Sequence, residues 1–275
     1  MKTIGGTLGH NMKFFPKARD ALGEVATMLE LAPSNTILMP AYCCKEMVEP
    51  FLGKCKVIYY SLDNKLQIDW EKLEPMLGDA GALLFAHSFG WPQDFKELQR
   101  IPGILKIEDM TQGQLSLYND GIPAGCYGDI SIASLGKCWP ISGAVMCRGS
   151  DAALKWHYAM DSMFSDDKLK RQENFFALLQ GMPKSKNFKP MFDQITSNIC
   201  PSHLPLTFVD KIRRDMAQDK LGKAGIHAPI HWNIPAPRHF EAEHKLADTI
   251  LSLPIDSRYG SLEMREILKV LELIA

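Results

Sequence analysis

The sequence has little net charge and no long apolar run. Its formal net charge is −1 over 275 residues, which argues against a general attraction to nucleic acid or to an anionic membrane surface. No apolar segment approaches the roughly 20 residues that a membrane-spanning helix needs. The opening Met1-Lys2-Thr3-Ile4 also lacks the apolar core of a signal peptide. We therefore expect a soluble, cytoplasmic protein without a nucleic-acid or membrane partner.

Paired cysteines are absent as well. The 7 cysteines form no Cys-x-x-Cys motif, and their odd number argues against a disulfide framework and against a zinc site. We expect no metal and a reducing compartment. The hydrophobic content of 46% and the charged content of 23% are those of an ordinary globular protein. The length is sufficient for one large domain or two moderate ones.

Short apolar runs alternate with segments of helical periodicity in the first half of the chain. A first amphipathic helix is expected over about residues 18–31. The apolar runs have the length of strands and lie at 37–39, 57–60, 82–85, 104–107, 130–132 and 144–146. This alternation predicts an α/β fold with a mostly parallel sheet covered on both faces. Ligands bind at the carboxyl ends of the strands in such sheets.

The pattern changes after about residue 150. We expect linking helices without a strand over 161–190, followed by a smaller α+β unit. Its predicted elements are strands at 206–208 and 226–232 and helices at 210–224, about 241–251 and 261–274. We therefore predict a large ligand-binding domain over residues 1–160, and linking helices with a small C-terminal domain over 161–275.

Two consecutive strand ends carry a distinctive set of side chains. The run Ile107-Glu108-Asp109-Met110-Thr111-Gln112 ends one strand, and Ser134-Leu135-Gly136-Lys137 ends the next. This combination suits pyridoxal 5′-phosphate, which needs a carboxylate for its ring nitrogen, a hydroxyl for its phosphate and an amine for its aldehyde. We predict that Lys137 is the catalytic Schiff-base lysine, and that Asp109 and Ser134 bind the cofactor. The structural alternatives are a surface lysine and an aspartate that caps a turn.

Four more residues are candidate cofactor contacts. Gln112 could donate to the phenolic oxygen, His87 could face the ring, and Tyr42 could stack on it. Arg19 lies at the amino end of the first predicted helix, where a phosphate is favoured. For each there is a structural alternative, namely a solvated glutamine, a packed histidine, a core tyrosine and a surface arginine.

The order of these motifs resembles that of the DegT/DnrJ/EryC1/StrS family of pyridoxal phosphate-dependent aminotransferases. Residues 107–112 are similar to the family's Glu-Asp-x-Ala-Gln, residues 127–129 to its Phe-Gly-Asp, and residues 251–255 to its Leu-x-Leu-Pro. The resemblance extends from about residue 18 to 270. It implies a type I transferase fold and a homodimer with active sites between subunits. It also implies transfer of an amino group, from a donor such as glutamate, to a keto-sugar in polysaccharide or secondary-metabolite biosynthesis.

The chain departs from the family mainly at the phosphate end of the site. Lys17-Ala18-Arg19 stands where Ser-Gly-Thr is usual, and the spacing from Ser134 to Lys137 is shorter. Two alternatives therefore stay open. One is another type I enzyme acting on a small amino acid, with Arg238 or Arg258 as the candidate for its α-carboxylate. The other is a non-catalytic relative that acts as a binding or regulatory protein.

Overall fold

The computed structural model describes residues 11–30, 34–99, 101, 103–139 and 141–275. Within these residues the strands are β1 (Met12–Phe15), β2 (Thr36–Pro40), β3 (Lys56–Tyr60), β4 (Ala82–Ala86), β5 (Leu105–Asp109), β6 (Ile130–Ser134), β7 (Ala144–Arg148), β8 (Phe188–Pro190), β9 (His203–Phe208) and β10 (Ile250–Pro254). The α-helices are α1 (Ala18–Glu30), α2 (Lys45–Val48), α3 (Trp70–Leu73), α4 (Phe95–Leu98), α5 (Leu135–Cys138), α6 (Ser150–Gly181), α7 (Lys211–Lys223), α8 (Glu241–Thr249) and α9 (Ser261–Glu272). Short 3₁₀ turns are η2 (Glu49–Phe51), η3 (Glu74–Asp79) and η4 (Ser88–Gly90).

The larger sheet has the strand order β1-β7-β6-β5-β4-β2-β3. Strands β3, β2, β4, β5 and β6 pair in parallel, whereas β7 is antiparallel to both β6 and β1. Successive side chains of a strand point to opposite faces. Ile37 and Met39 accordingly pack in a cluster with α1, while Leu38 and Phe85 pack in the other cluster with Trp156 of α6. The sheet is therefore buried on both faces, as the uninterrupted apolar runs predict.

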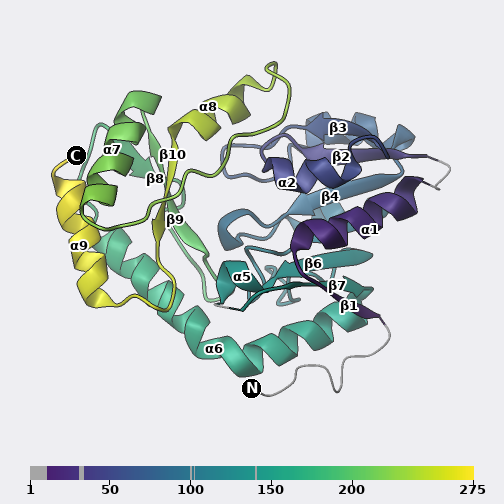
Figure 1. Cartoon of the computed structure of the whole chain (residues 1–275), viewed down its shortest axis with the longest axis horizontal. Helices are drawn as coiled ribbons and strands as arrows, with labels where there is room; N and C mark the ends of the chain where they lie inside the picture. The colour runs from purple at the N-terminus through teal and green to yellow at the C-terminus, as the bar shows by residue number, and fades with distance from the viewer. Residues whose placement is uncertain (1–10, 31–33, 100, 102, 140) are drawn as a thin grey trace.

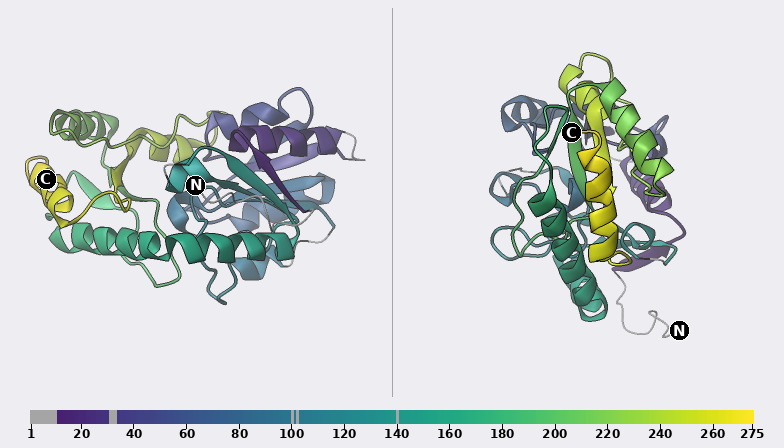
Figure 2. Two further views of the ribbon diagram at one scale, coloured as in Figure 1. Left: turned by 60° about the horizontal axis from the view of Figure 1, so that its bottom comes forward. Right: turned by 90° about the vertical axis from the view of Figure 1, so that its left-hand side faces the viewer.

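A second lobe is built on the antiparallel sheet β10-β9-β8. In Figure 1 this lobe lies on the left with α7 and α9, the large sheet lies on the right, and α6 runs beneath both. The turned views of Figure 2 show α6 as the long element that extends along both lobes. Its backbone departs from helical geometry at Phe164. The domain boundary predicted at residue 160 falls inside this helix.

The α/β fold and its mostly parallel sheet are confirmed. All six apolar runs of the first half form strands, and the first helix spans Ala18–Glu30. The strand predicted at 226–232 is wrong, because this segment has no regular secondary structure. Pro229 lacks the N–H group that a ladder needs, and its carbonyl instead accepts from Ser252 N at 3.0 Å.

Three short strands also differ from expectation. β1 was not predicted, β8 lies in the 161–190 segment expected to hold helices alone, and β10 contains residues 250–251, which were expected to be helical. Each of these strands has only three to five residues, too few to show a clear alternation in sequence. No helix among the described residues combines the length and the apolar character needed to cross a bilayer.

Candidate active site

The predicted site residues meet at the carboxyl edge of the large sheet. Asp109 is the last residue of β5, and Lys137 lies in α5, one turn after the end of β6. His87 follows β4, whose Ala86 pairs with Asp109. Because β4, β5 and β6 are parallel neighbours, residues that follow their ends come together in space.

A narrow pocket opens at this edge. Its lining includes Tyr42, His87, Asp109, Gln112 and Lys137, all of which were predicted from the sequence. Ser134 and Arg19 do not line it. The geometry therefore brings the ring-binding candidates together and leaves the two phosphate candidates outside.

The carboxylate of Asp109 is buried, and the protein provides a hydrogen-bond donor to one of its two oxygens. Asp109 is 5% exposed, and its Oδ1 accepts a hydrogen bond from Thr111 N at 2.8 Å. Among the described residues nothing donates to Oδ2. A buried carboxylate is costly unless a donor or a cation satisfies it, so this oxygen suits a protonated ring nitrogen.

Lys137 reaches this pocket from α5. Its Nζ donates to Thr111 Oγ1 at 3.2 Å, and no carboxylate among the described residues lies within ion-pairing distance of it. The same lysine also lines a larger cavity of about 700 Å³ between the lobes, together with His203, Asp256 and Arg258. Lys137 thus stands where a small pocket and a large cavity meet.

Glu108, next to Asp109, is fully buried and saturated with hydrogen bonds. Its Oε1 accepts from His87 Nε2 and from Tyr118 OH, both at 2.7 Å, and also from Gly125 N. Its Oε2 accepts from the backbone N–H groups of Tyr127 and Gly128. Burial raises the pKa of Glu108, but these donors, His87 first, outweigh burial and lower the pKa below its ordinary value.

His87 is held by the protein through both ring nitrogens. Nδ1 accepts from the backbone N–H of Gln93 at 3.2 Å, so the ring proton must lie on Nε2, which donates to Glu108. Through these two contacts His87 fastens the end of β4 to β5. Its predicted contact with a cofactor stays a prediction.

Gln112 is oriented by the backbone of η4. Its Oε1 accepts from Phe89 N at 2.9 Å, which fixes the amide so that Nε2 is the group able to donate to a ligand. Among the described residues Nε2 has no hydrogen-bond partner. This geometry is compatible with the predicted contact to a phenolic oxygen.

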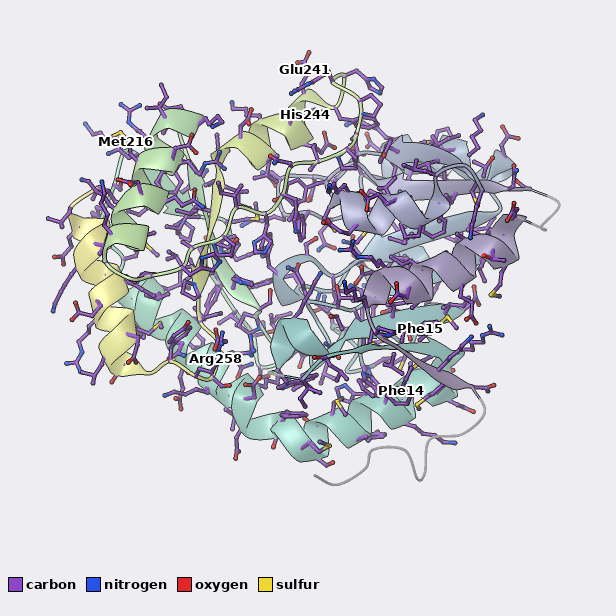
Figure 3. All side chains as sticks on the ribbon, viewed as in Figure 1. Phe14, Phe15, Met216, Glu241, His244 and Arg258 are labelled. Atoms are coloured by element: carbon purple, nitrogen blue, oxygen red, sulfur yellow. The ribbon has the colours of Figure 1, made fainter. Side chains whose placement is uncertain are left out.

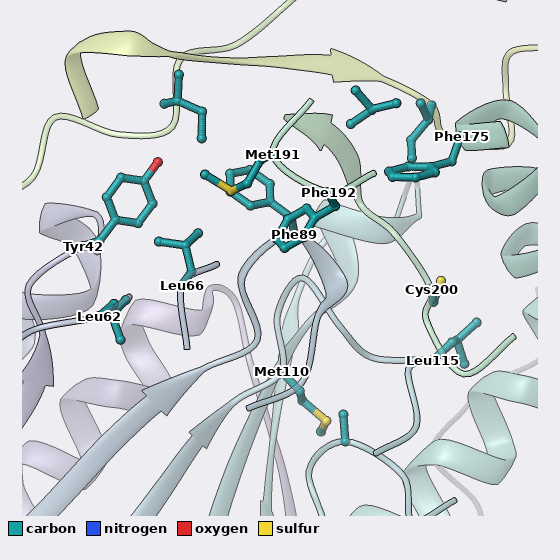
Figure 4. Packing of buried hydrophobic residues seen from close by; sticks show 14 of the residues in the cluster. Tyr42, Leu62, Leu66, Phe89, Met110, Leu115, Phe175, Met191, Phe192 and Cys200 are labelled. Atoms are coloured by element: carbon teal, nitrogen blue, oxygen red, sulfur yellow. The ribbon is translucent and has the colours of Figure 1, made fainter. Parts of the chain in front are cut away.

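Tyr42 connects the first lobe to the segment 226–240. Its hydroxyl donates to the carbonyl of His231, its ring lies 5.5 Å from that of Trp232, and burial raises the pKa of the hydroxyl. The ring of Trp232 also stacks on Phe89 at 6.2 Å. Figure 4 shows Tyr42 and Phe89 in the buried cluster that joins the sheet edge to Met191 and Phe192. Trp232 therefore covers one side of the pocket.

Two histidines of the second lobe lie close to the lysine. The rings of His203 and His231 are 4.9 Å apart. Burial lowers the pKa of both, and the positive charge of Lys137 adds to the effect, bringing His231 to about 4. Both are therefore neutral at pH 7, which limits the positive charge around Lys137.

The phosphate candidates are less well placed. Arg19 NH2 lies 3.9 Å from the carboxylate of Glu46. In the first turn of α1, Asp20 accepts from Lys17 N at 3.0 Å, so an anionic side chain already satisfies a free N–H group there. Ser134 is the last residue of β6 and the N-cap of α5, and among the described residues its side chain makes no capping hydrogen bond. Both assignments stay predictions.

The arginines considered for an α-carboxylate differ in position. Arg258 lines the large cavity with Lys137, and Figure 3 places it beside α6. Its guanidinium donates to both carboxylate oxygens of Asp256, at 2.6 and 3.1 Å. Arg238 is exposed and lines neither cavity. Arg258 is thus in the right place, but its charge is already neutralised.

Thr111 and Trp232 line the pocket but were not among the predicted site residues. Thr111 belongs to the motif at 107–112, and its position two residues after Asp109 is the signal that points to it. Trp232 reaches the pocket from a segment that was expected to be a strand. No local pattern could have found it, because its position depends on the packing of the second lobe.

Solved structures of known proteins share the fold of this chain, at low sequence identity. No protein-family model matches the chain, and no curated protein matches it in sequence. Among solved structures, PseC of Helicobacter pylori, an aminotransferase involved in the biosynthesis of pseudoaminic acid, superposes with a TM-score of 0.81 at 14% identity over 96% of this chain and 86% of its own. The chain has the fold of a sugar aminotransferase.

Two further structures show the same likeness. A DegT DnrJ EryC1 StrS aminotransferase from Brucella abortus has a TM-score of 0.76 at 16% identity, over 95% of this chain and 85% of its own. Spr1654 of Streptococcus pneumoniae, a sugar aminotransferase candidate solved in its PMP form, has a TM-score of 0.81 at 12% identity, over 96% and 85%. The fold predicted from the resemblance is therefore confirmed.

Proposed function

We propose that this protein is a pyridoxal phosphate-dependent aminotransferase that aminates a keto-sugar. One observation carries the proposal: the buried carboxylate of Asp109 and the amine of Lys137 line a single pocket at adjacent ends of parallel strands. A carboxylate and an amine so placed are the two groups that this cofactor requires of a protein. The structural neighbours described as sugar aminotransferases support the choice of reaction.

Each pocket residue has a distinct role in this proposal. When bound, pyridoxal phosphate supplies an aldehyde that captures amines and a ring that withdraws electrons. Asp109 would pair with the protonated ring nitrogen, and Gln112 Nε2 would donate to the ring hydroxyl. Lys137 Nζ would hold the aldehyde carbon, and its amine would move the proton at Cα of the amino donor. Tyr42 and Trp232 limit access of water from the second lobe.

The large cavity beside Lys137 is the proposed route for both substrates. We propose glutamate as the amino donor and a nucleotide-linked or free keto-sugar as the acceptor. Ser134 and Arg19 are proposed to contact the phosphate. A homodimer and a cytoplasmic location complete the proposal; both rest on the family resemblance and on the composition.

The cofactor assignment is tested by absorbance of the purified protein with added pyridoxal phosphate, followed by borohydride reduction and peptide mapping. We expect a visible band and a reduced label on Lys137. Lys137→Ala should lose the band and reduce turnover by about 100- to 10,000-fold, the range expected for loss of a general acid/base. Lys155→Ala, an exposed lysine of α6, is the matched control. A label at another lysine, or full turnover by Lys137→Ala, contradicts the proposal.

The acceptor is tested by half-reactions of the loaded enzyme. Loss of the visible band with L-glutamate, and its return with a keto-sugar nucleotide, is the expected result. Return of the band with small 2-oxo acids alone would favour an amino-acid enzyme. The Arg258–Asp256 contact argues against that alternative, because a guanidinium paired with a carboxylate is poorly available to a second one.

A further inference from the structure

Thr111 touches both chemical groups of the pocket. Its backbone N–H donates to Asp109 Oδ1 at 2.8 Å, and its hydroxyl oxygen accepts from Lys137 Nζ at 3.2 Å. The residue is 4% exposed and lines the pocket with both partners. One small side chain therefore links the carboxylate at the end of β5 to the amine after β6.

The surroundings keep Thr111 in this position. It lies in the turn that follows β5, where Gly113 N donates to Met110 O at 3.0 Å and Met110 N donates to Ile132 O of β6 at 3.0 Å. The backbone of Thr111 is thus anchored to both strands before its hydroxyl meets the lysine. An alanine, which the family motif has at this position, could form the contact to Asp109 but not the contact to Lys137.

We propose that Thr111 is a positioning residue, whose hydroxyl orients the amine of Lys137 toward the reacting atoms. This inference rests on the proposed function. Lys137 has a long, flexible side chain and no carboxylate partner among the described residues, so without the hydroxyl its amine would sample many rotamers. A fixed amine meets its target more often, because orientation contributes strongly to the rate of a proton transfer.

The first experiment uses the protein without cofactor. Reductive methylation with formaldehyde and cyanoborohydride, followed by peptide mass spectrometry, reports the reactivity of Lys137 relative to Lys155. An amine that donates to a fixed hydroxyl is restrained, and it meets a reagent from solution less often than a free amine does. We expect about threefold faster methylation of Lys137 in Thr111→Val and a wild-type rate in Thr111→Ser.

The second experiment uses the loaded enzyme. In single-turnover half-reactions at saturating amino donor, we expect the maximal rate of Thr111→Val to fall about tenfold. The donor concentration for half-saturation should change less than twofold, and Thr111→Ser should restore most of the rate. Thr27→Val is a matched control, since Thr27 accepts a hydrogen bond from Lys54 Nζ at 2.7 Å on the surface, away from the pocket.

The outcomes separate this inference from the proposed function. If the wild-type protein binds no cofactor, the proposed function fails, while the methylation experiment still reports on the contact. If Thr111→Val methylates and turns over like the wild type, the positioning role is wrong. Equal impairment of Thr111→Ser and Thr111→Val would also overturn it, because the hydroxyl would then be irrelevant.

Discussion

At the scale of single residues, Glu108 has the largest structural role at the site. Its two oxygens accept from three backbone N–H groups and two side chains. Gly128 fits beside it only because it lacks a side chain, since a Cβ there would lie 2.7 Å from Glu108 Cβ. Glu108 therefore anchors the loop that leads from β5 to β6, and with it the approach to Lys137.

Glu108→Gln should be strongly destabilising. Both oxygens of Glu108 accept hydrogen bonds, so in either orientation the NH₂ group of the new glutamine would face N–H or O–H donors that have lost their acceptor. Each unsatisfied buried group costs about 1–3 kcal/mol. We expect the free energy of unfolding to fall by about 3 kcal/mol, as in other broken buried charge networks, measured by urea denaturation. Glu71→Gln, at an exposed position in α3, should change it by less than about 0.5 kcal/mol. Equal stability of both variants would refute the anchoring role.

The sequence predicted individual residues of the pocket better than it predicted their contacts. Asp109 and Lys137 could be found because each follows an apolar strand, and strand ends of a parallel sheet converge. Glu108 stands beside Asp109 in the same motif, and its burial and hydrogen bonds give it a structural role. The hydrogen-bond partners themselves could not be predicted, because Tyr118 and Tyr127 reach Glu108 from a loop without periodicity.

At the scale of elements, the irregular segment 226–240 closes the pocket. It contributes His231, whose Nδ1 contacts Ser252 Oγ of β10 at 2.8 Å and whose carbonyl accepts from Tyr42. The segment is thus fixed at one side to the second lobe and at the other to the first. It makes few backbone ladder contacts, so these side-chain contacts determine its position.

The partly buried imidazole of His231 should make stability depend on pH. Its pKa is about 4 in the folded protein, against an ordinary 6.5. The unfolded chain therefore binds a proton that the folded protein does not, and stability falls as the pH drops below about 6.5. Between pH 7 and pH 5 this single group should cost about 2 kcal/mol.

Urea denaturation at the two pH values measures this effect. His231→Gln retains a polar contact for Ser252 and should show about 2 kcal/mol less loss between pH 7 and pH 5 than the wild type. His239→Gln, at an exposed position of the same segment, should keep the wild-type dependence. An unchanged dependence in His231→Gln would show that other groups, such as His203, dominate.

Regular elements could be predicted where the sequence carries a period or an uninterrupted apolar run. The strands of the large sheet are buried on both faces, and this makes their sequences conspicuous. The strand predicted at 226–232 is wrong because its apolar residues are buried without being part of a sheet. Segment 226–232 has strand-like apolar residues, Ile226 and Ile230, that pack partly buried on the core, yet their burial comes from tertiary contacts without a partner strand.

At the scale of the whole molecule, the site depends on both lobes. Lys137 and Asp109 come from the first lobe, whereas Trp232, His203 and Arg258 come from the second. We propose that the two units divide near residue 160, within α6 and close to its irregularity at Phe164. The stack of Phe164 on Trp139, with ring centroids 4.3 Å apart, connects this point to the residue that follows α5.

Cofactor binding should therefore stabilise the entire chain. At a free concentration 100-fold above the dissociation constant, a ligand adds about 2.7 kcal/mol. For a protein of this length we expect pyridoxal phosphate to raise the Tm by about 5 °C in scanning calorimetry. Lys137→Ala should show a smaller shift, whereas Lys155→Ala should match the wild type. A shift that is identical in Lys137→Ala would place the cofactor elsewhere.

The hydrogen bond from Tyr42 to His231 joins residues 189 positions apart in the chain, whereas Asp109 ends β5 and Lys137 lies just after the neighbouring strand β6. Contacts between distant positions form late, because long loops must close first. During synthesis the part of the pocket that holds Asp109 and Lys137 can form as soon as β6 and α5 have emerged. Trp232, which covers one side of the pocket, is synthesised only later. A newly made chain should thus pass through a stage in which its reactive lysine is present and unsheltered.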